Sequence, residues 1–199
     1  MRKKQRALTA VAQSKLPLWV VWVAYGACAW AFLFAALSCY WALGGMVGVD
    51  TAVSPHIAQL ARAHAPGLLA LLWITALVKV FSGFIALALV QSWGSRVPHG
   101  LLLILVWGAG TLLFVHGGLF LMVGILALSG TLSVSTPSTT LHWYTFLWGP
   151  WWLLGGLLFL MGAWSFFLRS PHRPVNFACS ILGVLGALFL LILSGGTIG

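Results

Sequence analysis

The sequence predicts an all-α, polytopic integral membrane protein: a bundle of five transmembrane helices with its N-terminus in the cytoplasm. Three observations lead to this fold class. Hydrophobic residues make up 61% of the 199 residues, charged residues only 6%, and long apolar segments alternate with short polar ones. A soluble domain carries about 25% charged residues and needs them to cover its surface. The composition therefore excludes a soluble enzyme, a disordered chain and a soluble nucleic-acid-binding domain.

Five apolar segments account for most of the chain. They cover about residues 18–43, 68–90, 101–128, 144–168 and 177–198. A helix needs about 20 residues to cross the hydrocarbon core. The first four segments meet this length, and the fifth does so with the weakly polar residues after Leu193. We expect residues 18–199 to form a single transmembrane domain, preceded by a basic segment over residues 1–17.

The distribution of Lys and Arg predicts the orientation. Eight of the ten lie in the N-terminal segment and in the loops 91–100 and 169–176, whereas the loops 44–67 and 129–143 hold only Arg62. Positive loops stay in the cytoplasm, so the C-terminus is expected outside. We expect these charges to contact lipid head groups of a bacterial plasma membrane, and we expect no nucleic-acid partner.

The outer loops and the glycines carry further expectations. Ser54 and Pro55 favour the start of a short amphipathic helix over about residues 54–65, with Ser54 as its N-cap. The Ser- and Thr-rich stretch 129–140 is expected to be a solvated loop. Glycines recur every seven residues at Gly110, Gly117 and Gly124, and this spacing favours close helix packing within the bundle over a dimer contact.

Lys79 is the strongest candidate for a functional residue, because it lies near the middle of the second apolar segment. A Lys at that depth costs about 2.5–3.5 kcal/mol on insertion scales. Thr75 and Ser82 share its helical face and could form a polar stripe with it. Three alternatives are open: an uncharged amine, an amine solvated by carbonyls, hydroxyls and water, or an amine that binds an anionic ligand or a partner's carboxylate.

Two further features of the spans could contribute to such a site. His116 lies at a similar depth in the third segment, and antiparallel neighbours could bring it to Lys79; a neutral histidine bonded to a neighbouring helix is the alternative. Trp148, Trp151 and Trp152 could line an apolar pocket where Pro150 breaks a backbone hydrogen bond, or they could serve packing and interfacial anchoring.

Metal and cofactor sites have little support in the sequence. The weak metal candidates are Asp50, His56, His64 and His142, whose spacing matches no metal motif, and an Asp50–Arg62 surface pair is the simpler expectation. The spans contain no Asp or Glu, and no nucleotide-binding or hydrolase motif occurs. We therefore expect neither a metal nor a cofactor.

The segment Cys39-Tyr40-Trp41-Ala42-Leu43-Gly44-Gly45 closes the first apolar run. With the spans that follow, over about residues 18–169, it resembles an uncharacterised bacterial membrane protein family, domain of unknown function 3995. Members of that family often have a histidine shortly before the Tyr, whereas Ser38 and Cys39 stand there in this chain. The resemblance implies no catalytic residues.

Three functional hypotheses follow from these residues. The first is binding or permeation of a small lipophilic, anionic molecule in an intramembrane pocket made by Lys79, His116 and the tryptophans. The second is a non-catalytic subunit or assembly factor of a membrane complex, in which a partner protein supplies a carboxylate to Lys79. The third is a membrane-embedded enzyme with Lys79 or His116 as general base, which the missing acids make the least supported.

Overall fold

The computed structural model describes residues 16–170 and 173–193, and these residues form helices joined by short turns and loops, with no strand among them. Most of the predicted basic segment 1–17 lies outside the described residues. So do residues 194–199, the end of the fifth predicted span.

Among the described residues, five helices are long and apolar enough to cross a membrane, the same number as the predicted segments. They are α2 (Leu18–Ala42), α5 (Pro66–Ala88), α6 (His99–Leu128), a continuous run from Ser138 to Arg169, and α9 (Arg173–Leu193). Proline fixes several of the starts: Pro17 precedes α2, Pro66 opens α5 and Pro98 precedes α6. Proline suits a first helical turn because the N–H that it lacks would have no partner there.

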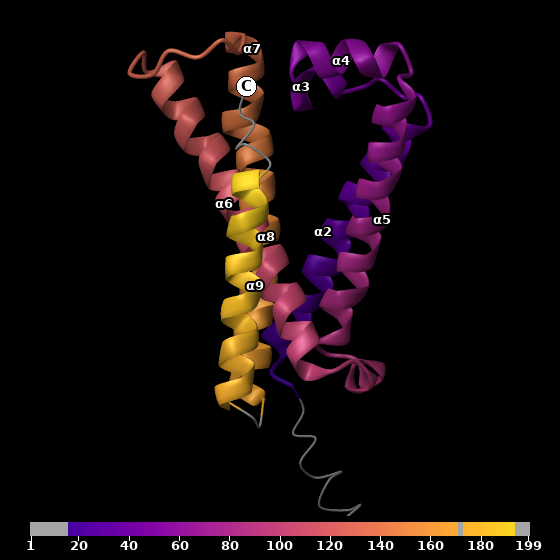
Figure 1. Ribbon diagram of the computed structural model, residues 1–199, viewed down its shortest axis with the longest axis vertical. Helices are drawn as coiled ribbons and strands as arrows, with labels where there is room; N and C mark the ends of the chain where they lie inside the picture. The colour runs from indigo at the N-terminus through magenta and orange to yellow at the C-terminus, as the bar shows by residue number, and fades with distance from the viewer. Residues whose placement is uncertain (1–15, 171–172, 194–199) are drawn as a thin grey trace, which may run out of the picture.

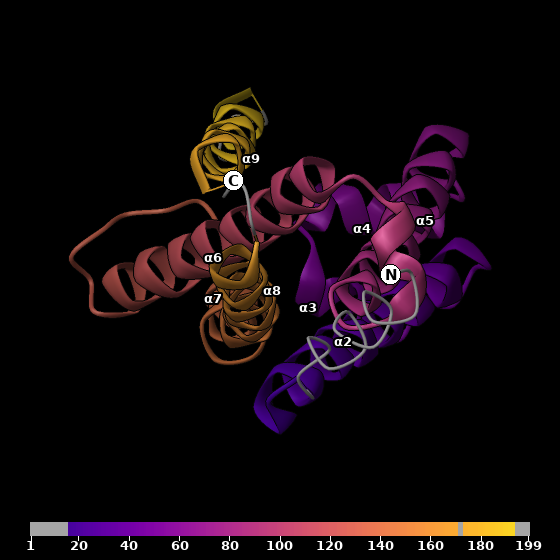
Figure 2. The same ribbon diagram turned by 90° about the horizontal axis from the view of Figure 1, so that it is seen from below.

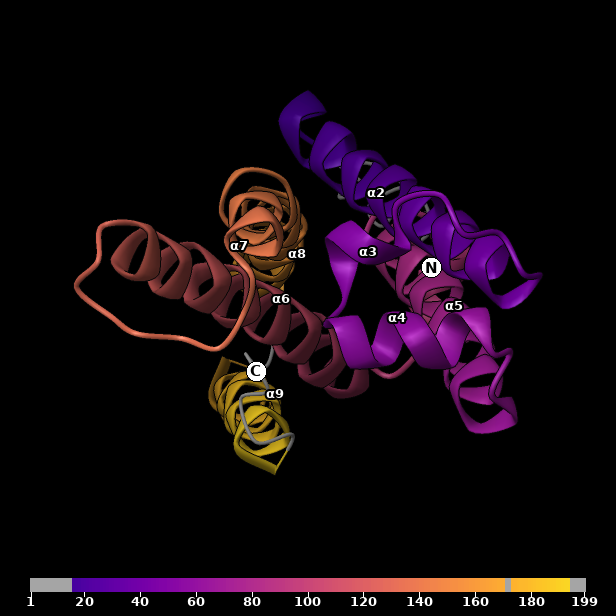
Figure 3. The same cartoon turned by 90° about the horizontal axis from the view of Figure 1, so that it is seen from above.

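The long helices form two arms (Figure 1). The first arm pairs α2 with α5, and the second arm packs α6 against both α8 (Gly149–Arg169) and α9. The short helix η1 (Ser92–Arg96) joins the arms at one end, and their axes diverge towards the other. In the end-on views α6 passes between α8 and α9, while α2 and α5 lie together beside them (Figures 2 and 3).

The diverging end carries α3 (Val49–Ala52), α4 (Pro55–Arg62) and α7 (Ser138–Trp143) (Figure 1). Helix α4 confirms the short helix expected near residues 54–65. Ser54 occupies the N-cap position with extended backbone, although its side chain makes no capping hydrogen bond. The expectation of a loop up to residue 140 was wrong at its end, because α7 begins at Ser138 and buries Thr140.

The fourth span accommodates Pro150 by widening its preceding turn. Residues Tyr144–Trp148 form a π-helical turn, η2, between α7 and α8, and Pro150 lies in the first turn of α8. A proline inside a helix lacks one donor and its ring crowds the carbonyl four residues earlier. A π turn shifts the hydrogen bonds to a spacing of five residues. The run from Ser138 to Arg169 is therefore continuous, although Pro150 itself donates no backbone hydrogen bond.

Glycines bring α6 and α8 into backbone contact. A Cβ placed on Gly117 would lie 2.7 Å from the Leu153 nitrogen and 2.8 Å from the Gly149 oxygen, and one on Gly156 would lie 2.5 Å from the Phe114 nitrogen. Only glycine permits this approach. The glycine spacing therefore serves packing inside the bundle, as expected.

Large aromatic side chains connect the two arms. Trp30 and Phe34 of α2 meet Trp148, Trp151 and Trp152 of η2 and α8 through ring contacts with centroids 4.8–6.3 Å apart. The two arms are thus joined by rings, whereas the helices of the second arm touch through small residues.

Candidate ligand-binding site

Lys79 lies in the middle of α5, thirteen residues after Pro66 and nine before Ala88. Its Nζ atom donates a hydrogen bond of 2.6 Å to Ser38 Oγ on α2 and lies 3.6 Å from the centre of the Phe34 ring. Ser38 is only 1% exposed. The amine is therefore held against α2 inside the first arm by one hydrogen bond and one cation–π contact.

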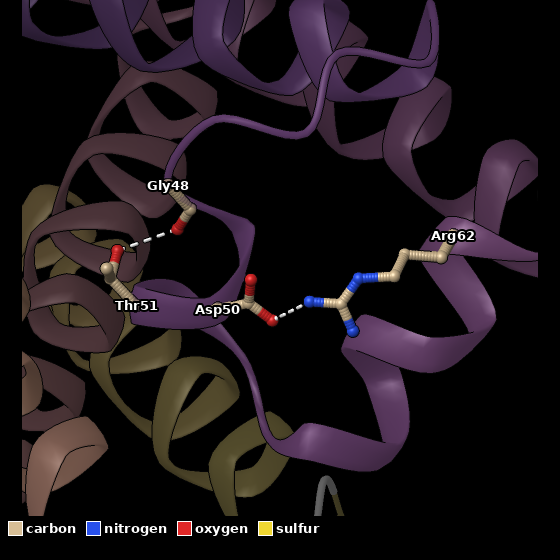
Figure 4. Close-up of polar contacts among 4 residues, drawn as sticks. All are labelled: Gly48, Asp50, Thr51 and Arg62. Carbon is tan, nitrogen blue, oxygen red and sulfur yellow. Dashed lines mark hydrogen bonds and ion pairs between the residues drawn. The ribbon is translucent and has the colours of Figure 1, made fainter.

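The single acidic side chain of the protein is occupied elsewhere. Asp50 of α3 forms an ion pair with Arg62 of α4, and the neighbouring Thr51 hydroxyl donates to the Gly48 carbonyl at 2.6 Å (Figure 4). Both partners of the ion pair are exposed. The expected surface pair between Asp50 and Arg62 is thus confirmed. Lys79 has no carboxylate partner among the described residues.

Lys79 borders a cavity of about 290 Å³ between the two arms. Helices α2, α5, α6 and α8 all contribute to its wall. Apart from Lys79 and two hydroxyl groups, the lining is apolar: Trp30, Ala31, Phe34, Val78, Ala109, Leu112, Leu113, Trp152 and Phe159. The site therefore combines one amine with an aromatic and aliphatic wall, which is the composition typical of a pocket for a small amphiphilic molecule.

Thr75 and Ser82 supply the two hydroxyl groups, so the polar stripe expected on the face of Lys79 lines the cavity. Thr75 Oγ1 donates to the Leu72 carbonyl at 3.0 Å and Ser82 Oγ to the Val78 carbonyl at 2.8 Å. These bonds use the hydroxyl protons, and the oxygen lone pairs stay available. Both groups can therefore accept a further hydrogen bond but are not placed to donate one.

The tryptophans of the fourth span divide between two roles. Trp152 lines the cavity. Trp148 and Trp151 do not line it: Trp148 stacks on Phe34, and Trp151 stacks on Trp30, whose Nε1 donates to the Trp151 carbonyl at 2.9 Å. Trp148 and Trp151 therefore serve packing, the alternative to lining a pocket, because their rings connect the two arms.

His116 does not line the cavity of Lys79. Its ring lies edge-on to Phe120 and Trp152, with centroids 4.5 and 4.8 Å apart, and Trp152 in turn contacts Phe34. His116 is thus connected to Lys79 through two rings that contact each other, Trp152 and Phe34. The expected single basic pocket is corrected to one amine in the cavity and one histidine behind its aromatic wall.

Three of the four weak metal candidates, Asp50, His64 and His142, make local contacts. His64 Nδ1 lies 3.2 Å from the Arg62 carbonyl and His142 Nδ1 lies 2.7 Å from the Ser138 carbonyl, while Asp50 is paired with Arg62. Within residues 16–170 and 173–193, no three His, Cys, Asp or Glu side chains gather as metal ligands would, so His56 has no such partners either.

Sequence reasoning missed Ser38 and Phe34, the two residues that hold the amine of Lys79. Both belong to α2, and nothing in the sequence says which helix faces Lys79. The only signal was the presence of a hydroxyl group at Ser38 inside an otherwise apolar run.

Comparison with known proteins gives one match. A family model described as "Protein of unknown function (DUF3995)" matches residues 31–159, a range that runs from the middle of α2 into α8 and includes every residue that lines the cavity except Trp30. No curated protein and no solved structure matches the chain.

Proposed function

Because the chain belongs to the DUF3995 family, whose function is unknown, we propose its function from its own cavity: it binds a small lipophilic anion beside Lys79. One observation carries this proposal. The amine of Lys79 borders an otherwise apolar cavity in a protein whose single acidic side chain is paired elsewhere. No acidic side chain of this protein is then left to pair with Lys79, and an external anion would supply its counter-ion.

The energetics favour an external anion. Placing Lys at the centre of a membrane helix costs about 2.5–3.5 kcal/mol. A hydrogen bond between membrane helices, such as that to Ser38, recovers about 0.6 kcal/mol on average, and a cation–π contact about 0.5–2 kcal/mol. A carboxylate or similar head group in the cavity would add a charge-assisted hydrogen bond, which is about twice as strong as a neutral one.

The proposed setting is a bacterial plasma membrane, with the N-terminus and the η1 loop in the cytoplasm. The Lys and Arg distribution supports this orientation. Exposed Ser95 of η1 and exposed Ser135 before α7 allow a direct test. In a background without the three native cysteines, an impermeant maleimide should label Ser135→Cys on intact cells and Ser95→Cys only after lysis. The reverse labelling would overturn the orientation.

Binding is tested on purified protein with hexadecanoate as the probe and native mass spectrometry as the readout. We expect one bound hexadecanoate, at least about tenfold weaker binding by Lys79→Met, and retained binding by Lys79→Arg; a tenfold change corresponds to about 1.4 kcal/mol, within reach of one charge-assisted contact. Arg96→Met is the matched control, because it removes an exposed cation outside the cavity.

Two results would overturn the proposal. One is equal binding of hexadecanoate by the wild type and Lys79→Met, both showing native helicity by circular dichroism. The other is equal affinity of the wild type for hexadecanol, which has the same chain without the charge. A different result would favour the role of a complex subunit over ligand binding: another protein co-purifies with the wild type but not with Lys79→Met, and no hexadecanoate is bound.

A further inference from the structure

A second and larger cavity adjoins the cavity of Lys79. Its volume is about 530 Å³, and α5, α6 and α9 form most of its wall. Five residues line both cavities: Val78 and Ser82 of α5, Ala109 and Leu112 of α6, and Phe159 of α8. The two cavities therefore meet where α5 passes α6.

Two glycines, Gly108 and Gly183, are among the residues that line the second cavity. Gly108 of α6 and Gly183 of α9 pack so closely that a Cβ on Gly108 would lie 3.3 Å from the Gly183 carbonyl oxygen. Its rim is apolar and exposed, with Phe81 on α5 and Phe189 on α9 more than half accessible. No charged side chain lines it. The second cavity thus has the character of a groove for a hydrocarbon chain, open on the side of the candidate spans that lipid would contact.

The following inference rests on the proposed function. We propose that the ligand is a single-chain amphiphile that enters laterally from the lipid bilayer. Its anionic head group lies at Lys79, and its hydrocarbon tail passes between α5 and α6 into the groove against α9. The charge of Lys79 selects the head group, the exposed apolar rim admits the tail, and the shared residues connect the two. Each cavity is near or within the range of about 300–1,000 Å³ that small-ligand sites occupy.

Gly186 allows the groove to be filled without disturbing the fold. It lines the second cavity, it is exposed, and a Cβ added to it would meet no atom within 4 Å. Gly186→Phe should therefore place a ring in the groove. Gly118→Phe is the matched control, since Gly118 lines neither cavity and the nearest atom to its added Cβ is 4.0 Å away on the flexible Leu153 side chain.

The experiment compares octanoate with hexadecanoate on the full-length protein. We expect Gly186→Phe to weaken hexadecanoate binding about tenfold, the effect of displacing roughly two methylene groups from an apolar site, and to leave octanoate unchanged. Gly118→Phe should change neither. Hexadecanoate with a photoreactive diazirine at its tail end should label α5 and α9 near Gly186, and Lys79→Met should abolish that labelling.

The outcomes separate this inference from the proposed function. Tail labelling on α2 or η2 that still depends on Lys79 would overturn the groove and leave the proposed function intact. Loss of hexadecanoate binding in Gly186→Phe without any loss in Lys79→Met would overturn the role of Lys79. A third outcome concerns the kind of lipid. If the wild type binds a two-chain phospholipid that hexadecanoate cannot displace, and Gly186→Phe no longer binds that phospholipid, the proposal of a single-chain ligand is overturned.

Discussion

The contact between α6 and α8 can be tested with one methyl group. Gly117→Ala adds a Cβ that would lie 2.7 Å from the Leu153 nitrogen and 2.8 Å from the Gly149 oxygen, whereas ordinary van der Waals contact is 3.4–4 Å. Both atoms belong to the backbone, so no side chain can rotate away and the helices must separate by several tenths of an ångström. Overpacking of this kind costs about 1–3 kcal/mol.

The neighbouring glycine provides the control for this prediction. Gly118→Ala makes the same chemical change on the same helix, but its Cβ would lie 4.0 Å from the nearest atom. Replacing glycine by alanine within a helix favours the helix by up to about 1 kcal/mol. We therefore expect different changes in the free energy of unfolding. Gly117→Ala should lower it, and Gly118→Ala should leave it unchanged or raise it.

The assay is reversible unfolding in mixed micelles with increasing dodecyl sulfate, followed by circular dichroism. The free energy of unfolding of each variant is compared with that of the wild type. Equal stability of Gly117→Ala and Gly118→Ala would refute the reasoning, because it would mean that α6 and α8 do not approach through Gly117. A loss in both variants would also refute it, because the harm would then not come from this contact.

Three smaller effects follow from other contacts. Ser38→Ala removes the acceptor of the Lys79 amine, so unfolding in the same assay should become easier by about 0.6 kcal/mol, at most about 1.7 kcal/mol, while hexadecanoate binding persists. Trp30→Phe removes the hydrogen bond to the Trp151 carbonyl and should lower stability by at least a similar amount, because part of the ring stacking is lost with it. Asp50→Asn breaks an exposed ion pair, so its effect should stay within about 0.2–1 kcal/mol and vanish at high salt; a larger effect that persists in salt would contradict this account.

The sequence predicted the helices well because each depends on local information. Apolar length set the five long helices, and prolines set several of their starts. Boundaries failed where tertiary contacts extended a helix. Helix α7 begins within a Ser- and Thr-rich stretch that a local analysis assigns to a loop, and Thr140 is buried there.

At the candidate site, too, the sequence predicted what depends on local geometry and missed what depends on tertiary contacts. Lys79, Thr75 and Ser82 were predicted together because a helix places residues four and three positions apart on one face, and all three line the cavity. The pairing of Lys79 with His116 failed. That expectation rested on similar depth alone, and depth does not say which faces of two helices meet or which rings fill the space between them.

The sequence alone determined that the protein has five candidate membrane helices, one amine in the middle of a span and one acidic side chain outside the spans, since composition and order fix these properties. Only the tertiary structure decided what surrounds that amine. Contacts between helices depend on how side chains of different size pack across their faces, and this packing placed Ser38 and Phe34 at Lys79, the tryptophans between the arms and an apolar groove beside the cavity.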